Sequence, residues 1–135
     1  MKVSMAAELA VRGILTLAAR YEQDPMPLDE ICRVRSLPKA YMTRIFGQLV
    51  RANVIRAVRG KGGGYVLARP RAQTTLLEVI EAIEGPLALN LCQHNPPRCK
   101  MVDCSVRPIW AKVQEQIREV LAHQTLDKLV SNDHQ

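Results

Sequence analysis

The sequence predicts a mainly α-helical fold, a winged helix-turn-helix head with a two-stranded β-hairpin wing, followed by a long C-terminal dimerisation helix. Three observations favour this class. Apolar residues recur at helical spacing in several segments, and a glycine-rich turn separates two short apolar runs. Of the 135 residues 47% are hydrophobic but only 4% are aromatic. A largely aliphatic core of this kind is typical of packed helices and disfavours an aromatic-rich β-sandwich.

Two helices joined by a tight turn are expected to follow an N-terminal helix. The first helix is predicted over residues 5–21, with Ser4 as its N-cap. The next two are predicted over 28–34 and 38–52, and the second of them is amphipathic and basic. This pair predicts a helix-turn-helix, a motif that places its second helix in the major groove of DNA.

A β-hairpin is predicted directly after the helix-turn-helix. Two short runs, 54–58 and 65–67, flank a six-residue turn that contains four glycines. Glycine permits positive φ angles and a close approach of the backbone, and Arg59 and Lys61 bring positive charge to the tip. We expect this wing to reach a groove of DNA.

The C-terminal half is predicted to contain two longer helices. Thr75 is expected to cap the first, which ends at Glu84, and Glu78 is placed to complete a capping box. The second is expected over 106–122. Its apolar residues form a narrow stripe: Ile109, Val113, Ile117 and Val120.

That narrow stripe is typical of a helix that packs against another helix. The preceding chain can form a small core by itself, so the stripe is expected to meet a second copy in a symmetric homodimer. A short terminal helix is expected over 125–130. The predicted division is a DNA-binding domain at 1–85, a cysteine-rich loop at 86–105, and the dimerisation helix with its tail at 106–135.

Charge is distributed unevenly along the chain. Residues 1–71 contain 13 Lys and Arg against 5 Asp and Glu, a net charge of +8, whereas residues 72–135 contain 6 against 8, a net charge of −2. The basic half is the candidate nucleic-acid surface. No segment approaches the roughly 20 apolar residues that span a bilayer, and the N-terminus lacks the pattern of a signal peptide. We therefore expect no membrane association and a reducing, cytoplasmic location.

Three of the four cysteines lie close together in a polar segment. Cys92, Cys99 and Cys104 are spaced for a loop that wraps several thiolates around one metal centre. A zinc site completed by His94 is an alternative, although zinc knuckles usually begin with cysteines two to four residues apart. A thiol switch is a second alternative. Cys32 lies in an apolar run and is expected to be buried.

The sequence resembles the Rrf-two family of bacterial winged-helix regulators in three features. These are the hairpin VRGKGGGYVLARP, the helix PKAYMTRIFGQLVRANVI before it, and the three cysteines ahead of a C-terminal helix. The similarity covers nearly the whole chain. The Rrf-two family includes iron–sulfur sensors of the IscR and NsrR types. The resemblance implies a homodimeric transcription factor in which an iron–sulfur cluster, [4Fe–4S] or [2Fe–2S], controls DNA binding.

The resemblance also implies a ligand set. By position, Cys92, Cys99 and Cys104 match the cluster-binding cysteines of the family. IscR-like members have a histidine three residues after the third cysteine, but this chain has Arg107, which cannot ligate. NsrR-like members use a carboxylate from the first helix of the other subunit, and the matching position is Glu8. His94 is the competing candidate for the fourth ligand.

The DNA contacts follow from the helix-turn-helix and the wing. Side chains near the start of the second helix face base edges, those further along it contact phosphates, and the wing tip enters or flanks the minor groove. The candidates for bases are Lys39, Thr43 and Arg44, those for phosphates are Gln48, Arg51, Arg56, Arg69 and Arg71, and those of the wing tip are Arg59 and Lys61. A dimer predicts a palindromic operator with half-sites roughly 34 Å apart.

Two classes of function remain open at this point. The first is a transcriptional regulator, a repressor, that responds to nitric oxide, redox state or iron–sulfur supply. The second is a small iron–sulfur metalloprotein without DNA regulation, which explains the cysteines but neither the helix-turn-helix nor the wing. An enzyme is disfavoured, because the glycine-rich turn lacks the spacing and the strand-to-helix setting of a nucleotide site.

Overall fold

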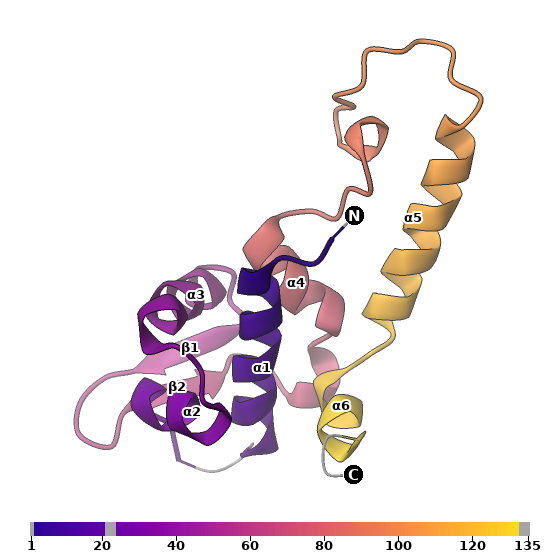
Figure 1. The fold of residues 1–135 in the computed structure, drawn as a ribbon. Coiled ribbons are helices and arrows are strands. Elements are labelled where there is room, and N and C mark those ends of the chain that lie inside the picture. Colours follow the sequence, from indigo (N-terminus) through magenta and orange to yellow (C-terminus); the bar gives the residue numbers. More distant parts are fainter. Residues whose placement is uncertain (1, 21–23, 133–135) are drawn as a thin grey trace.

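The computed structural model describes residues 2–20 and 24–132, which form a head with a long helix and a loop extending from it (Figure 1). The helices are α1 (Met5–Ala19), α2 (Leu28–Arg35), α3 (Lys39–Arg51), α4 (Leu76–Glu84), α5 (Arg107–Ala122) and α6 (Leu126–Asn132), the strands are β1 (Ile55–Val58) and β2 (Gly64–Leu67), and two short 3-10 turns are η1 (Arg71–Gln73) and η2 (Leu91–Gln93). This architecture confirms the mainly helical winged fold.

Helix α1 occupies the centre of the head. The side chain of Ser4 caps it by accepting a hydrogen bond from the backbone N–H of Ala7 at 3.1 Å, as expected. Small residues on its inner face allow α2, α3, α4 and α6 to pack closely around it. The end of the predicted helix, at Tyr21, lies outside the described residues.

Helices α2 and α3 form the predicted helix-turn-helix. Ser36 ends α2 in the left-handed conformation with φ of 54°. This turn lets the N–H of Leu37 donate to the carbonyl of Cys32 at 2.8 Å, which satisfies one of the last carbonyl groups of α2. Leu37 is buried, so the turn is anchored to the core and holds the two helices at a defined angle.

The wing pairs β1 with β2 in antiparallel register, from Ile55 opposite Leu67 to Val58 opposite Gly64. Its base is fixed to the head, because Tyr65 exchanges backbone hydrogen bonds with Met26 and packs edge-to-face on the ring of Phe46 at 5.0 Å. Gly64 is required here: it has φ of 152°, and a Cβ would lie 2.5 Å from the carbonyl oxygen of Met26.

The chain returns to the head after α5. The N–H of Leu126 donates to the carbonyl of Thr74 at 3.0 Å, and the N–H of Leu76 donates to the carbonyl of Gln124 at 2.8 Å. Leu126 and Val130 of α6 are buried in the same core as α1. The predicted terminal helix is therefore present and completes the head, although the sequence-based division placed it with the dimerisation segment.

Helix α5 leaves the head and carries the cysteine loop at its far end (Figure 1). Every one of its residues is exposed or half-buried within the described chain. The apolar stripe predicted from sequence is included, with Ile109 57% and Val120 63% exposed. Helix α5 thus presents an uncovered apolar face. Every helix among the described residues is too short or too polar to span a bilayer.

The capping box predicted for α4 forms only in part. Thr75 accepts from the N–H of Glu78 at 3.2 Å, as expected. The Glu78 carboxylate, however, pairs with the guanidinium of Arg69, so it serves to tie the end of the wing to α4. The two 3-10 turns were not predicted, since three-residue elements leave no periodic pattern.

Replacing Gly13 with Ala is expected to lower the free energy of unfolding by about 1–3 kcal/mol. Its Cβ would lie 2.7 Å from Cε1 of Phe46 and 2.8 Å from Cε of Met42. The methionine methyl can move, but the Phe46 ring is fully buried. Urea unfolding followed by circular dichroism measures the effect.

Gly47→Ala is the matched control in α3. Its Cβ would meet only Arg51, at 3.6 Å, so this variant is expected to keep or gain stability, by up to about 1 kcal/mol, from helix propensity. Equal unfolding midpoints for the Gly13 variant and the wild type would contradict the close packing of α1 on α3.

Candidate nucleic-acid interface and cysteine loop

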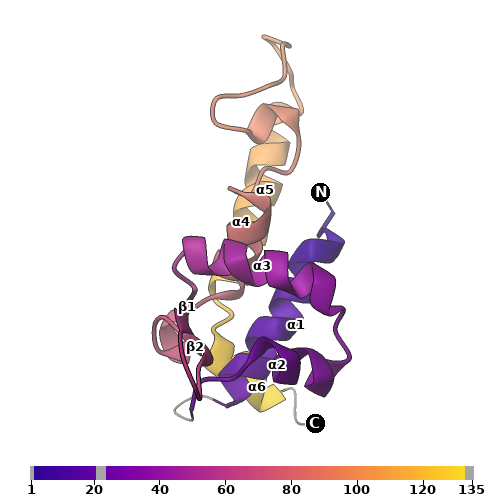
Figure 2. The same cartoon turned by 90° about the vertical axis from the view of Figure 1, so that its left-hand side faces the viewer.

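Helix α3 and the wing lie on the same face of the head, on the side away from α5 (Figure 2). The core side of α3 is formed by Met42, Ile45, Phe46 and Leu49, all buried. Its opposite side is polar, and the predicted contacts Lys39, Thr43, Arg44 and Arg51 are all exposed there, with Gln48 half-buried. The structure therefore brings together the α3 residues that the sequence singled out.

Lys39, at the start of α3, forms an ion pair with Asp29 of α2 at 2.5 Å. The hydrogen bond that Lys39 donates to the Asp29 carboxylate raises the pKa of Lys39 above its usual value, so the lysine stays charged. Both side chains are mostly exposed, and surface pairs of this kind are weak. The sequence alone did not predict this pairing of Asp29 with a predicted base contact.

Two further α3 residues adjoin the N-terminal end of α1. Arg44 and Gln48 line a groove of about 910 Å³ between α1, α3 and α4, together with Met5 and Tyr41. Thr43 donates its hydroxyl to the carbonyl of Lys39 at 3.1 Å. Arg44 and Gln48 therefore face α1 across this groove.

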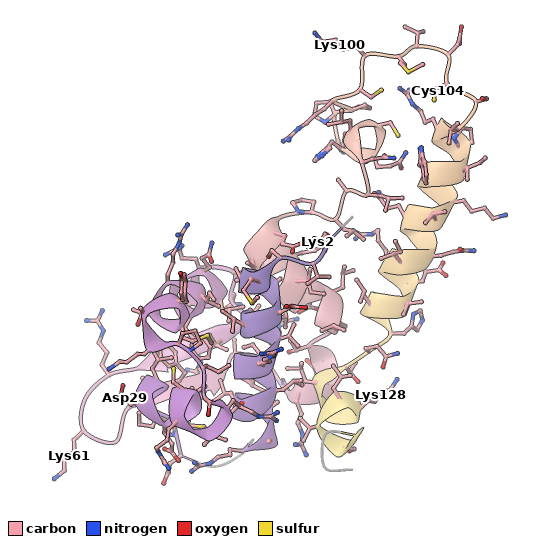
Figure 3. All side chains as sticks on the ribbon, in the orientation of Figure 1. Lys2, Asp29, Lys61, Lys100, Cys104 and Lys128 are labelled. Atoms are coloured by element: carbon pink, nitrogen blue, oxygen red, sulfur yellow. The ribbon has the colours of Figure 1, made fainter. Side chains whose placement is uncertain are left out.

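The wing exposes Arg56, Arg59 and Lys61, and Lys61 marks its projecting tip (Figure 3). Two arginines after the wing, for which phosphate contacts are predicted, also make contacts within the chain. Arg69 pairs with Glu78, and Arg71 donates to the carbonyl of Ala18 at 3.1 Å. These contacts brace the wing and α1 against the head.

The three clustered cysteines lie in the loop between α4 and α5. Cys92 belongs to η2, and its thiol contacts the Oδ1 of Asn90 at 3.0 Å while Gln93 donates to it at 3.1 Å. Cys99 and Cys104 follow in the irregular part of the loop. All three are half-buried free thiols. Within residues 2–20 and 24–132, however, no three His, Cys, Asp or Glu side chains lie close enough together to hold a metal ion.

The other candidate ligands lie apart from the thiols. His94 lines a small pocket with Glu84 and Leu87 at the head end of the loop. Glu8 is exposed on α1, in the head. The loop between α4 and α5 stands beyond the head in both views (Figures 1 and 2), and Cys104 lies in it (Figure 3). Within one chain, Glu8 and the three cysteines therefore lie in separate parts of the structure.

Arg107 reaches back from the first turn of α5 into the cysteine loop. Its Nη2 donates to the carbonyl of Met101 at 2.8 Å, and its backbone N–H donates to the carbonyl of Cys104 at 3.2 Å. Its Nε is buried and has no hydrogen-bond acceptor among the described residues. An unpaired buried donor favours an acceptor, so the loop suits an anionic centre with sulfur atoms, such as a thiolate-bound metal cluster.

Acidic residues of α4 connect the head to this loop. The Oε2 of Glu81 accepts from the N–H of Leu87 at 2.7 Å and from the guanidinium of Arg118 on α5 at 2.9 Å. The Oε1 of Glu84 accepts from the N–H of Ser4, at the start of α1, at 2.6 Å. Successive turns of α4 therefore hold the beginning of the loop, α5 and α1.

Cys32 has no part in this site. It is buried between α2 and the rest of the core with 7% exposure, as the sequence predicted. Burial, together with the charge of Asp29, raises the pKa of the Cys32 thiol, so it remains protonated and unreactive at neutral pH.

A model of the Rrf2 family, described as an iron-dependent transcriptional regulator, matches residues 3–132. The chain belongs to the Rrf2 family. Among its relatives, the transcriptional regulator IscR of Xenorhabdus nematophila is 29% identical over 133 residues, which are 98% of this chain and 80% of the relative. The family model and this relative are both described as transcriptional regulators. The chain is therefore a DNA-binding transcriptional regulator rather than an enzyme.

Solved structures agree with the family. The structure of IscR from T. potens has a TM-score of 0.81 at 26% identity and covers 98% of this chain and 88% of its own. The structure of CymR, the global cysteine regulator of B. subtilis, has a TM-score of 0.84 at 24% identity and covers 98% of both chains, which shows a shared fold. The winged-helix prediction is thus confirmed.

Proposed function

We propose that the chain is a homodimeric repressor whose affinity for a palindromic operator is controlled by an iron–sulfur cluster bound to Cys92, Cys99 and Cys104. One observation carries the proposal: three half-buried free thiols share a loop whose start Glu81 joins to the DNA-binding head. The description of the family as iron-dependent supports it. The signal we propose is nitric oxide, redox state or iron–sulfur supply.

Three thiolates and one weaker ligand would hold the cluster. Thiolates are the usual ligands of iron–sulfur clusters, and a carboxylate as the fourth ligand leaves one iron easier to attack. Glu8 of the partner subunit would supply that carboxylate, with His94 as the alternative. When bound, the cluster supplies an iron atom that reacts with nitric oxide or oxidants.

The shape of one chain supports a shared site. The cysteine loop projects away from its own α1, while α5 presents an uncovered stripe that a second copy would bury. Val113, Ile117, Val120 and Leu121 line an apolar surface groove along that stripe. Antiparallel pairing of two α5 helices would place each loop beside the head of the partner, because the loop and the head lie at opposite ends of α5.

The head would respond through α4 and α1. A change in the loop acts on Leu87, whose N–H is held by Glu81, and a change at Glu8 acts on α1 directly. Helix α1 borders the same groove as Arg44 and Gln48, so its position bears on the DNA-facing side of α3. Two states that differ in these contacts would differ in DNA affinity.

The DNA contacts proposed for this face are those of a winged helix. Lys39, Thr43 and Arg44 would face base edges, and Gln48, Arg51 and Arg56 would contact phosphates. Arg59 and Lys61 would enter or flank the minor groove, where the negative potential favours basic side chains. We therefore assign residues 1–85 to DNA binding, 86–105 to the cluster, and 106–135 to dimerisation. The last segment includes α6, which packs back on the head.

Two alternative functions of the cysteines, a zinc site and a thiol switch, can be distinguished from a cluster by experiment. A zinc ion with Cys92, Cys99, Cys104 and His94 would give a colourless tetrahedral site. Without any metal, half-buried thiols in an irregular loop can form a disulfide, which would make the loop a thiol switch.

Purification without oxygen tests the central assignment. The protein is expected to be coloured and to contain iron and sulfide in similar amounts, as measured by metal and sulfide analysis and visible absorption. Glu8→Ala is expected to lose the cluster roughly 10-fold faster, because a ligand to one iron is missing.

Glu115→Ala, which removes a carboxylate from α5, is the control and is expected to behave as the wild type. A colourless protein with stoichiometric zinc and no sulfide would overturn the cluster assignment. An unchanged spectrum and lifetime in the Glu8 variant would remove Glu8 from the ligand set.

Arg59→Ala is expected to weaken operator binding about 10-fold and to reduce the salt slope of binding by about one, because one groove contact is lost. Fluorescence anisotropy with labelled DNA at several salt concentrations measures both. Lys128→Ala removes the same charge from α6, far from the wing tip (Figure 3), and should change neither. Equal affinities for the Arg59 variant and the wild type would refute the wing contact.

Val120→Glu is expected to convert the dimer to a monomer, because it places a charge in the stripe of α5. Val120 is 63% exposed in the single chain, so the head should keep its stability. Ala111→Glu adds the same charge on the other side of α5 and should remain dimeric. Light scattering after gel filtration gives the mass of each, and a dimeric Val120 variant would contradict pairing through this stripe.

A further inference from the structure

Arg107, the first residue of α5, directs a basic side chain back into the cysteine loop. It follows Cys104 by three residues and begins α5. Its guanidinium turns back over the loop, where Nη2 donates to the carbonyl of Met101, midway between Cys99 and Cys104. Arg98 and Lys100, the neighbouring basic residues, are exposed instead.

The guanidinium of Arg107 is only partly satisfied. Its Nε is buried, yet nothing among the described residues accepts a hydrogen bond from it. Its positive charge also has no carboxylate within ion-pair distance in the part of the chain that the structure describes. A buried donor on a cation is costly unless an anionic acceptor fills the space beside it.

We propose that Arg107 donates a hydrogen bond from Nε to a sulfur atom of the centre held by the three cysteines, and that it thereby raises the reduction potential of that centre and slows its loss. The inference rests on the proposed iron–sulfur function. Three thiolates and a carboxylate give such a centre a net negative charge, which a fixed guanidinium stabilises. Hydrogen bonds to sulfur and nearby positive charge both favour the more negative, reduced state.

This role differs from ligation. Arginine remains protonated and offers only donors, so it cannot bind iron. In the first turn of α5, however, its tether to Met101 holds the planar guanidinium in one orientation. Arg107 would therefore set the properties of the centre from a position where a histidine would instead coordinate it.

The test compares wild type, Arg107→Leu, Arg107→Lys and the control Arg98→Leu, all purified without oxygen. Readouts are iron and sulfide content, reduction potential by spectroelectrochemistry, the iron–sulfur stretching bands in resonance Raman spectra, and the rate of cluster loss to a chelator. Arg107→Leu is expected to shift the potential negative, change the stretching bands and raise the rate of loss roughly 10-fold. Arg98→Leu removes the same charge from an exposed position of the same loop and should match the wild type.

Arg107→Lys separates the hydrogen bond from the charge. It keeps the positive charge but not the planar donor, so its rate of loss should rise while its potential shifts less than in Arg107→Leu. Should Arg107→Leu lose the cluster entirely, the Lys variant still provides the comparison.

A wild-type cluster with unchanged potential, bands and lifetime in Arg107→Leu would overturn this inference alone. Equal effects of the Arg98 and Arg107 variants would also overturn it, because the change in potential and lifetime would then come from the loss of any positive charge in the loop. An Arg107→Lys protein that matches the wild type would overturn it as well. A wild-type protein without sulfide would overturn the proposed function itself.

Discussion

The carboxylate of Glu81 is the contact through which the two ends of this molecule are joined. It accepts from the backbone of Leu87, where the loop begins, and from Arg118, in the C-terminal half of α5. Hydrogen bonds to a charged group contribute roughly 1.5–3 kcal/mol each, toward the low end where solvent reaches the pair. This carboxylate thus joins the start of the loop and α5 to the head through one side chain.

The same helix also organises the rest of the head. Glu78 holds Arg69 at the end of the wing, and Glu84 holds the N–H of Ser4 at the start of α1. Three carboxylates spaced three residues apart thus reach three different elements. Because α4 is packed against α1 and α3, a shift of the loop has a short physical route to the DNA-facing side of α3. A rigid helix with contacts at each turn is suited to pass on such a shift.

Local patterns predicted most of the fold. The cap at Ser4, the glycine turn of the wing and the helical spacing of α3 each depend on neighbouring residues, so the sequence alone reveals them. The Glu81–Arg118 pair spans 37 positions and leaves no periodic signal. The place of α6 in the core was hidden for the same reason, because it depends on backbone pairing between Thr74 and Leu126 across the chain.

The candidate site was predictable in its residues but not in its arrangement. Cysteine spacing identifies the loop, whereas the separation of Glu8 from that loop follows from the direction of α5, which only the structure provides. Arg69 illustrates a second limit of local patterns: the sequence suggested a phosphate contact, but it did not reveal the pairing of Arg69 with Glu78.

The central claim is that the state of the cysteine loop controls DNA affinity through α4. It is tested most directly by the dissociation constant for a selected operator, measured with cluster-loaded and cluster-free protein, in the wild type and in Glu81→Gln. The account predicts a difference of about 10-fold or more between the two wild-type states. It also predicts a clearly smaller ratio in Glu81→Gln, with the cluster retained. Equal affinities of the loaded and cluster-free wild type would contradict it.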